Sequence, residues 1–498
     1  MDRETLDLIR VCVWELEVNI YPGLCLIMGS TTSGKLRTIR NFGRNIIFSP
    51  QHHEVARDEA DVLEILKRHS GRRVRAHGSL HSWSEAARCD DVSIDVGHLN
   101  RVQLNTDTLQ PTATVGAGCR IKNLVSELNR HGWTTPTLGL IKEQTIAGAT
   151  ATATHGSGRH CLSHYICSLR LATYDSAGIP IVRVISDGDE LRAACCSLGS
   201  MGIVTEVTIP IRKQYSIEEH FREYLELESV LAAEDEYPIQ QFFFIPWRWS
   251  YLAQHRRESQ ASHSWHVPFY RAFWAFGMDH GLHWIIIAIA RWLPVSLCPF
   301  AFRFVLPNLV PRRWRVVDRS DRQLTMQHHL YRHIETELFV KKSQLTDMLK
   351  MIRWLLEWSA GREHPGCDAW TAGLTESGMS SEFGKLRGCY RHHYPICIRK
   401  VLPDKGLVTM SGSDDDEAWY AVSFISYVNS DQRAGFFLFA TVLTHLASHF
   451  FSARPHWGKH YPPTIQFQEF YPDFERFLDV RNRIDPTNAF LPTWMVRD

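Results

Sequence analysis

The sequence has no excess of charge of either sign and no Cys-x-x-Cys motif. Its 498 residues include 55 lysines and arginines against 54 aspartates and glutamates, for a formal net charge of +1 at pH 7. A nucleic acid is not expected as a partner, because proteins that bind one present a basic surface. The 12 cysteines are scattered, and no two form a Cys-x-x-Cys pair. The pattern therefore indicates neither a zinc site nor a disulfide framework, and a reducing compartment is expected.

The sequence also lacks the features of a cleavable secretory signal. Met1 to Glu4 includes two acidic residues where a signal peptide would be basic, and no small-residue cleavage site follows an apolar core. We therefore expect an intracellular protein. Gly29 to Lys35 fits the first seven positions of a phosphate-binding P-loop, but Leu36 stands where a Ser or Thr would hold magnesium. A flexible connector within an N-terminal extension, residues 1–40, is the favoured interpretation.

An uninterrupted apolar run long enough to cross a membrane is absent as well. Between His255 and Arg319 the chain has apolar stretches from Trp284 to Ala290 and from Trp292 to Phe302, broken by Arg291 and two prolines. A spanning helix needs about 20 apolar residues. The flanks are rich in Trp, Phe, Arg and His, which is typical of a membrane interface. Contact with a membrane surface is expected here, and a buried helical hairpin is the alternative.

The chain is too long for one core, so two or three domains are expected. Short strands and helices of mixed order predict an α+β domain that ends near Lys213. Further strands and an amphipathic helix predict a second α+β domain. Strands are expected at 74–76, 91–96, 112–115, 201–210, 242–249, 335–340 and 394–399, and helices at 61–71, 121–128, 189–198, 346–358 and 473–484.

Three segments of unusual composition organise the rest of the chain. Thr145 to Gly158 is almost entirely Gly, Ala, Ser and Thr, so its backbone can approach another body closely and line it with N–H groups. Upstream lies Ala76-His77-Gly78-Ser79-Leu80-His81-Ser82-Trp83-Ser84, and near the C-terminus lies Arg454-Pro455-His456-Trp457-Gly458-Lys459. For the first segment alone, a glycine-rich surface loop is the plainer interpretation.

In this order the three segments resemble the flavin-dependent oxidases of the vanillyl-alcohol oxidase type, and most of all the sugar-lactone oxidases and the related alditol oxidases. The resemblance runs from about Asn41 to Asp498. It implies a two-part FAD-binding domain of the PCMH type at 41–213 and a substrate or cap domain at 214–455 with an apolar insert at 255–319. A C-terminal segment at 456–498 then returns to the first domain.

The resemblance also implies which residues hold the cofactor. His81 matches the histidine that bonds covalently to the 8α-methyl of the flavin, and the backbone before it should wrap the pyrophosphate. Many relatives have Gly where this chain has Leu80. The residues implied to bind FAD are Ala76, His77, Gly78, Ser79, Leu80, His81, Ser82, Gly139, Thr145, Gly148, Ala149, Thr152, His155, Gly156, Gly202, Ile203 and Val204.

Two cations match residues that act in catalysis. Lys459 would stand near the flavin N1 and the substrate hydroxyl, where positive charge favours hydride transfer. Arg399 matches the arginine of the family's Glu-x-Arg strand pair, although a solvated strand end is the plainer alternative. The family's Glu is here Cys397, and a thiol is a poor substitute for a carboxylate that accepts two hydroxyls. The sequence therefore indicates the chemistry but does not define the substrate.

The resemblance implies oxidation of a CH–OH group of a sugar 1,4-lactone, of the arabinono- or gulono-lactone type, with oxygen as acceptor and hydrogen peroxide as co-product. Gly139 supports oxygen, because related dehydrogenases have Ala at the matching position. Its plainer role would be a turn with positive φ. The open alternatives are an alditol or other carbohydrate oxidase, a degenerate FAD-binding protein with little turnover, and a membrane-anchoring scaffold.

Overall fold

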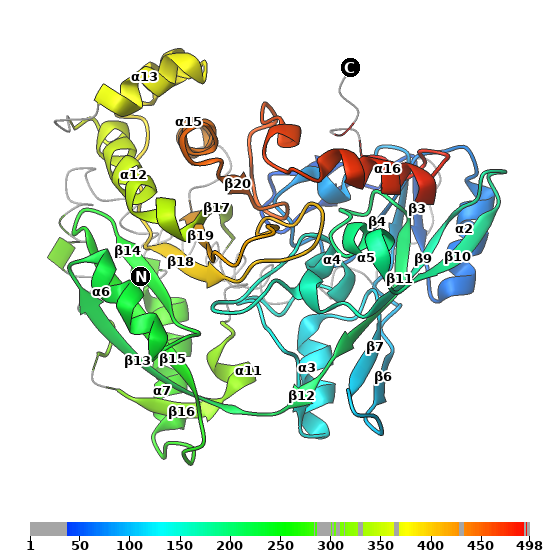
Figure 1. The fold of residues 1–498 in the computed structure, drawn as a ribbon, viewed down its shortest axis with the longest axis horizontal. Helices are drawn as coiled ribbons and strands as arrows, with labels where there is room; N and C mark the ends of the chain where they lie inside the picture. Colours follow the sequence, from blue (N-terminus) through cyan, green and yellow to red (C-terminus); the bar gives the residue numbers. More distant parts are fainter. Residues whose placement is uncertain are drawn as a thin grey trace, which may run out of the picture.

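The computed structural model describes residues 37–282, 284–285, 300, 303–304, 309–312, 314–326, 332–362, 368–427, 433–492 and 495. Two bodies of sheet lie side by side, and both belong to the α+β class that the sequence predicts (Figure 1). The stretch from Gly29 to Leu36 lies outside the described residues. So does most of the apolar run from Trp284 to Phe302, of which only Trp284, Ile285 and Phe300 are described.

The first body holds two sheets with a helix between them. A parallel sheet has the strand order β3-β5-β4, and an antiparallel sheet has the order β10-β9-β11-β7-β6. Helix α2 lies between them because its apolar face, Val62, Ile65 and Leu66, packs with residues of both sheets. The elements are β3 (His52–Val55), α2 (Glu59–Arg68), β4 (Val74–His77), β5 (Val92–Asp95), β6 (Val102–Asn105), β7 (Thr112–Gly116), α3 (Ile121–Arg130), α4 (Ile146–Ala151), β9 (Ser168–Tyr174), β10 (Pro180–Ile185), α5 (Gly188–Ala194) and β11 (Ile203–Pro210). Two short ladders join β1 (Ile39–Arg40) to β2 (Ile47–Phe48) and β8 (Trp133–Thr134) to β12 (Arg212–Lys213).

The second body is one antiparallel sheet of eight strands. Its order is β16-β13-β15-β14-β18-β19-β17-β20, so strands far apart in the sequence are neighbours. The strands are β13 (Ser216–Tyr224), β14 (Gln241–Ile245), β15 (Ser250–Ser259), β16 (Val316–Arg319), β17 (Ile334–Lys341), β18 (Ile396–Val401), β19 (Trp419–Ser426) and β20 (Arg454–Pro455). The sequence places a strand over 242–249, but β14 ends at Ile245. Trp247 and Trp249 take positive φ angles of 69° and 57°, which turns the chain into β15.

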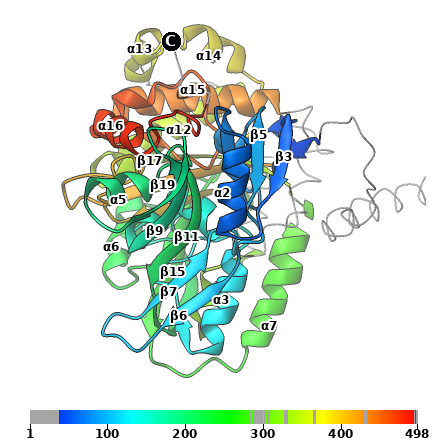
Figure 2. The ribbon, with the colours of Figure 1, turned by 90° about the vertical axis from the view of Figure 1, so that its right-hand side faces the viewer.

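Helices cover one face of this sheet. Helices α12 (Leu345–Ser359) and α15 (Ala434–Phe451) pack on it through a large apolar cluster, and α13 (Asp368–Glu376) and α14 (Ser380–Leu386) lie outside them (Figure 2). Among the described residues, α15 alone is long and apolar enough to cross a membrane. More than half of it is buried in the protein, so core packing accounts for its composition. Helix α6 (Leu227–Ala232) and the short α11 (Ser320–Gln323) complete this body.

The last helix joins the first body. Helix α16 (Phe474–Ile484) matches the helix predicted at 473–484 and lies beside α5, at the red end of the chain in Figure 1. Phe477, Val480 and Ile484 pack there in the same core cluster as Ala193 and Ala194.

Part of the predicted insert is helical. Helix α7 (Val267–Ala272) continues into the π-helical segment η5 (Phe273–Leu282). Figure 2 shows α7 at the margin of the molecule, at the end opposite α13 and α14.

Candidate active site

The three unusual segments converge, although they are far apart in the sequence. A Cβ on Gly78 would lie 2.3 Å from Oγ1 of Thr145. Only glycine therefore allows the Ala76–Ser84 segment and the Thr145–Gly158 run to come this close. Ser82 Oγ donates to the carbonyl of Gly458 at 3.2 Å, and the amide of Trp83 donates to the same oxygen at 2.9 Å. These contacts bring the His81 loop, the small-residue run and the Lys459 turn to one place.

Two adjoining cavities open at this place. The first, which we call the cradle, is bounded by the His81 loop, by the start of α4 and by the Leu198–Gly202 turn. The second, which we call the sheet cavity, lies on the face of the eight-stranded sheet that α12 and α15 do not cover. Gln144, His456 and Lys459 line both cavities and so mark their junction.

Most residues that the resemblance assigns to FAD face the cradle. They are Ala76, His77, Gly78, Ser79, Leu80, His81, Ser82, Thr145, Gly148, Thr152, Gly202 and Val204. Gly139 and His155 line the sheet cavity instead. Ala149 and Ile203 are buried in the apolar clusters behind the cradle, and Gly156 packs on the carbonyl of Leu138. All seventeen assignments to the cofactor remain predictions.

The cradle fits the long, flat FAD group. Its walls carry small side chains or none, as at Ala147, Ala151 and Gly199, so a ligand can lie against backbone. Arg75 also lines the cradle, a position that the sequence did not single out. Its guanidinium donates to the carbonyls of Gly199 at 3.0 Å and Phe490 at 2.9 Å, and thereby fixes one end of the wall.

The His81 loop is held in an uncommon backbone conformation. Leu80 has a φ of 55°, in the left-handed region that costs a residue with a Cβ about 1–2 kcal/mol. This gives a physical reason for the glycine that many relatives have there. The carbonyl of Leu80 accepts from the amide of Phe42 at 2.9 Å, and the Phe42 ring stacks on His81 with centroids 4.8 Å apart. The imidazole is therefore oriented at the edge of the cradle.

The lining of the sheet cavity changes from apolar to charged in the order of the strands. At the β13, β15 and β14 end the wall is Phe221, Leu252, Phe243 and Ile245, and Trp274, Met278 and Val310 close it from outside the sheet. Strands β18 and β19 contribute Cys397, Arg399, Ser423 and Ile425. Strand β17 and the turn after β20 contribute Glu335, Glu337, His456 and Lys459. A ligand in this cavity meets charge at the cradle end and hydrocarbon at the other.

Two carboxylates that the sequence did not single out neutralise the two predicted catalytic cations. Arg399 Nη2 donates to Glu337 Oε1 at 2.6 Å, and Lys459 forms an ion pair with Glu335. Both glutamates lie on β17, two residues apart and hence on one face. The amides of His456 and His460 donate to the carbonyls of Glu337 and Glu335, which aligns the Lys459 turn with β17.

Burial and mutual attraction set the charges at this end. Burial alone would raise the pKa of Glu337, but Arg399, His155 and Lys459 hold it well below its usual range. Burial lowers the pKa of His155 and of His456, so both rings are neutral at pH 7. Within the described chain, Glu337 Oε2 accepts no hydrogen bond although it is buried and lines the cavity. It can therefore accept one from a ligand hydroxyl.

Cys397 is the residue that the resemblance matches to the family's glutamate. It pairs with Phe243 on one side and with Ser423 on the other, at the border between the apolar and charged parts of the wall. Burial raises the pKa of its thiol to about 11, so it carries no charge at neutral pH. The carboxylates of this site come from β17 instead.

Gly139 lines the sheet cavity close to Thr154. Its φ is not positive, so a turn that only glycine can adopt does not explain it. A Cβ there would lie 2.8 Å from Cγ2 of Thr154 and would have to displace that methyl group.

Comparison with known families agrees with this arrangement. A family model described as FAD binding domain matches residues 50–177, and one described as D-arabinono-1,4-lactone oxidase matches residues 207–498. The chain is 47% identical to a long-chain alcohol oxidase from an uncultured marine euryarchaeote, over 91% of this chain and 95% of the relative. It is 28% identical to an L-gulono-1,4-lactone dehydrogenase from Mycobacterium tuberculosis, over 87% and 92% of the two chains.

The fold is also found among solved structures. The cholesterol oxidase of Brevibacterium sterolicum superposes with a TM-score of 0.69 at 14% identity, covering 93% of this chain and 96% of that one. At that identity the likeness concerns the fold alone.

The buried pair of Arg399 and Glu337 yields a prediction on stability. Glu337→Gln leaves a buried guanidinium uncompensated and should lower the free energy of unfolding by about 3–5 kcal/mol. Adding Arg399→Met should restore part of that loss, because the double variant buries no unpaired charge. Denaturant unfolding of the flavin-loaded protein measures both effects.

The matched control is the surface pair of Lys341 and Asp415. Lys341→Met and Asp415→Asn should each change stability by less than about 1 kcal/mol. Additive effects of the two substitutions at Glu337 and Arg399 would contradict the interpretation.

Proposed function

The chain belongs to the D-arabinono-1,4-lactone oxidase family of FAD-linked oxidases, and on that premise we propose that it oxidises the CH–OH group of an alcohol with an apolar chain. Oxygen takes the electrons and is released as hydrogen peroxide. The proposed substrate class rests on the lining of the sheet cavity, which is charged at the cradle end and apolar beyond Cys397.

FAD, when bound in the cradle, supplies the acceptor for the hydride that leaves the carbon. The protein holds the alcohol so that this carbon faces the cradle. Glu337 Oε2 accepts a hydrogen bond from the substrate hydroxyl and takes its proton as the hydride leaves the carbon, and the Lys459 ammonium stabilises the negative charge that grows on that oxygen. Arg399 keeps Glu337 ionised, because its charge lies 2.6 Å from the carboxylate.

The apolar part of the cavity is suited to a hydrocarbon tail. Phe221, Ile245, Leu252, Met278 and Val310 form one buried cluster with few polar atoms to pair with further hydroxyls. Each CH₂ moved from water into such a wall contributes about 0.8 kcal/mol. The relative at 47% identity is named a long-chain alcohol oxidase, which supports the same substrate class.

A sugar 1,4-lactone is the second candidate. The family model and several relatives are named for such lactones. Arg399, Glu337 and Ser423 at the charged end offer groups that pair with ring hydroxyls. The thiol of Cys397 weighs against it, since a polyol would lose a carboxylate partner at that position.

We propose that FAD is attached through His81. The imidazole lies at the edge of the cradle and is oriented by its stacking on Phe42. Gly139 supports oxygen as the acceptor, because the absent side chain leaves space between Thr154 and the cavity.

We also propose that the segment from Trp265 to Leu309 contacts a membrane surface. Eight of the fourteen large apolar side chains that are exposed in the described residues come from this segment. Trp265 is 83% and Phe269 is 67% exposed, at one face of α7 and the turn before it. Exposed aromatic groups concentrated in this way mark an interaction surface.

Covalent attachment predicts that flavin stays with the protein after denaturation. Acid precipitation of the wild type should leave yellow colour in the pellet, and His81→Ala should release it to the supernatant. His333→Ala, a histidine that lines the sheet cavity, is the control and should retain the colour. Wild-type protein that loses all its flavin to the supernatant would exclude the bond.

The apolar wall predicts that kcat/KM rises with the chain length of a primary alcohol, by up to about fourfold for each added CH₂. Leu252→Gln should lower kcat/KM for long alcohols about tenfold and leave that for short ones nearly unchanged. Tyr251→Phe, on the opposite face of β15, is the control. Peroxide release measures each rate.

The same assay with L-gulono- and D-arabinono-1,4-lactone separates the two candidates. A kcat/KM for either lactone above that for every aliphatic alcohol would reject the apolar-chain proposal. If none of these compounds reduces the flavin under anaerobic conditions, the result would favour the alternative of a degenerate FAD-binding protein with little turnover.

The exposed aromatic segment predicts that the detergent-free protein floats with phospholipid vesicles. The pair of substitutions Trp265→Ser and Phe269→Ser should weaken binding at least tenfold, because each buried aromatic ring contributes roughly 1.5–3 kcal/mol. Leu109→Ser and Leu225→Ser remove equally exposed side chains elsewhere and should have no effect. Wild-type protein that stays at the bottom of the gradient would contradict the proposal.

A further inference from the structure

Two histidines and an aspartate meet on the parallel sheet, outside the sheet cavity, and one of them, His77, also lines the cradle. His53 lies on β3, Asp95 on β5 and His77 on β4, and β5 is the middle strand. In the pairing of the strands, His77 lies opposite Asp95. On β3 the residue opposite Asp95 is Val55, and His53 lies two residues before it. Their side chains therefore emerge from the same face, because residues two apart on a strand share a face.

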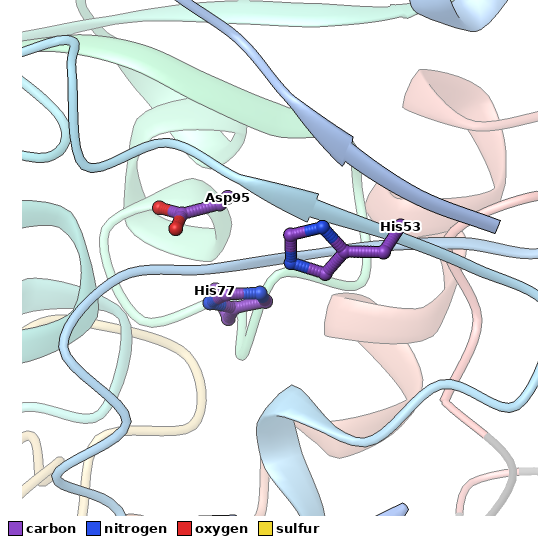
Figure 3. A group of neighbouring side chains, drawn as sticks. All are labelled: His53, His77 and Asp95. Atoms are coloured by element: carbon purple, nitrogen blue, oxygen red, sulfur yellow. The ribbon is translucent and has the colours of Figure 1, made fainter. Parts of the chain in front are cut away.

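The three side chains surround one space (Figure 3). One ligand atom from each lies within 4.8 Å of the others, and the two imidazole rings have centroids 5.7 Å apart. Ligand atoms around a tetrahedral ion with bonds of about 2.1 Å lie about 3.4 Å apart. Small rotations of the side chains would therefore close the group around an ion.

His77 has the arrangement of a metal ligand that is already oriented. Its Nδ1 lies 3.3 Å from the carbonyl of Gly78, which can only accept, so Nδ1 carries the proton. The lone pair is then on Nε2, which is buried and has no hydrogen-bond partner within the described chain. In most metal-binding histidines, one ring nitrogen binds the ion and the other donates a hydrogen bond to a carbonyl or a carboxylate.

Asp95 and His53 are partly engaged. Asp95 Oδ1 accepts from the amide of Gly97 at 2.8 Å, which orients the carboxylate. Arg37 Nη1 lies 3.3 Å from His53 Nδ1, and because a guanidinium only donates, that nitrogen accepts. A metal on Nε2 of His53 would require the proton to move to Nδ1 and the exposed Arg37 to turn away. Arg37 thus opposes binding, both by its charge and by the tautomer it selects.

We propose that His53, His77 and Asp95 form a binding site for a divalent ion of the zinc type, with water in the remaining position. Two imidazole nitrogens and one carboxylate favour Zn²⁺ and its neighbours over Ca²⁺ or Mg²⁺, which prefer oxygen. His53 and Asp95 are partly exposed, so the ion enters from solvent. Since Gly78 follows His77, a bound ion would tie the start of the His81 loop to β3.

The test is equilibrium binding of Zn²⁺ to the flavin-loaded protein. Binding is measured by calorimetry and by competition with a chromogenic chelator. The wild type should bind one ion, and His53→Ala and Asp95→Asn should each weaken binding at least tenfold, more than the loss of an outer contact costs. His52→Ala is the matched control, because the adjacent His52 packs on His69 instead and should leave affinity unchanged.

Arg37→Ala tests the geometry from the opposite direction. It removes the repelling charge and the constraint on the His53 tautomer, so it should tighten Zn²⁺ binding several-fold while the flavin spectrum stays the same. The site is rejected if the wild type binds no Zn²⁺, or if His52→Ala reduces binding as much as His53→Ala. Equal affinity for Ca²⁺ would reject the proposed donor set.

Discussion

Four charges from three separate segments are buried together where the two cavities meet. Glu335 and Glu337 come from β17, Arg399 from β18, and Lys459 from the turn after β20. None of these groups could be buried alone without a penalty of several kcal/mol. Their pairing therefore constrains the register of β17 against its neighbours and the position of the Lys459 turn. The polarity of the whole site depends on this neutral cluster.

The sequence predicts the cradle much better than the sheet cavity. The His81 loop and the small-residue run are recognisable because glycine at Gly78 and Gly148 meets a local need, the close approach of Thr145. Glu335 and Glu337 gave no such signal. Carboxylates at alternate positions of a strand normally indicate a face in contact with water. Here both glutamates are buried, and only the pairing with Arg399 and Lys459, more than sixty residues away, explains how the charges are tolerated.

Strand order accounts for most of what the sequence could not show. Strands β13, β15 and β19 were not predicted, because buried polar residues such as Glu219, Gln254 and Ser423 interrupt their apolar pattern. The gradient of the sheet cavity exists only after β14 pairs with β18 and β19 pairs with β17. The loss of a glutamate at Cys397 looks like a loss of function in the sequence. In the fold it marks the border where the wall becomes apolar, with both carboxylates supplied two strands away.

Part of the wall of the sheet cavity and the exposed aromatic face come from the same piece of chain. Trp274 and Met278 are four residues apart on η5 and line the cavity, whereas Phe269 and Phe276, seven apart, are exposed. One pair therefore faces the cavity and the other faces the outside of the molecule. A residue change that alters how this segment packs must therefore affect the apolar end of the cavity as well as the outer surface. The proposed surface contact and the proposed chain-length selectivity are for this reason linked through the described residues of α7 and η5.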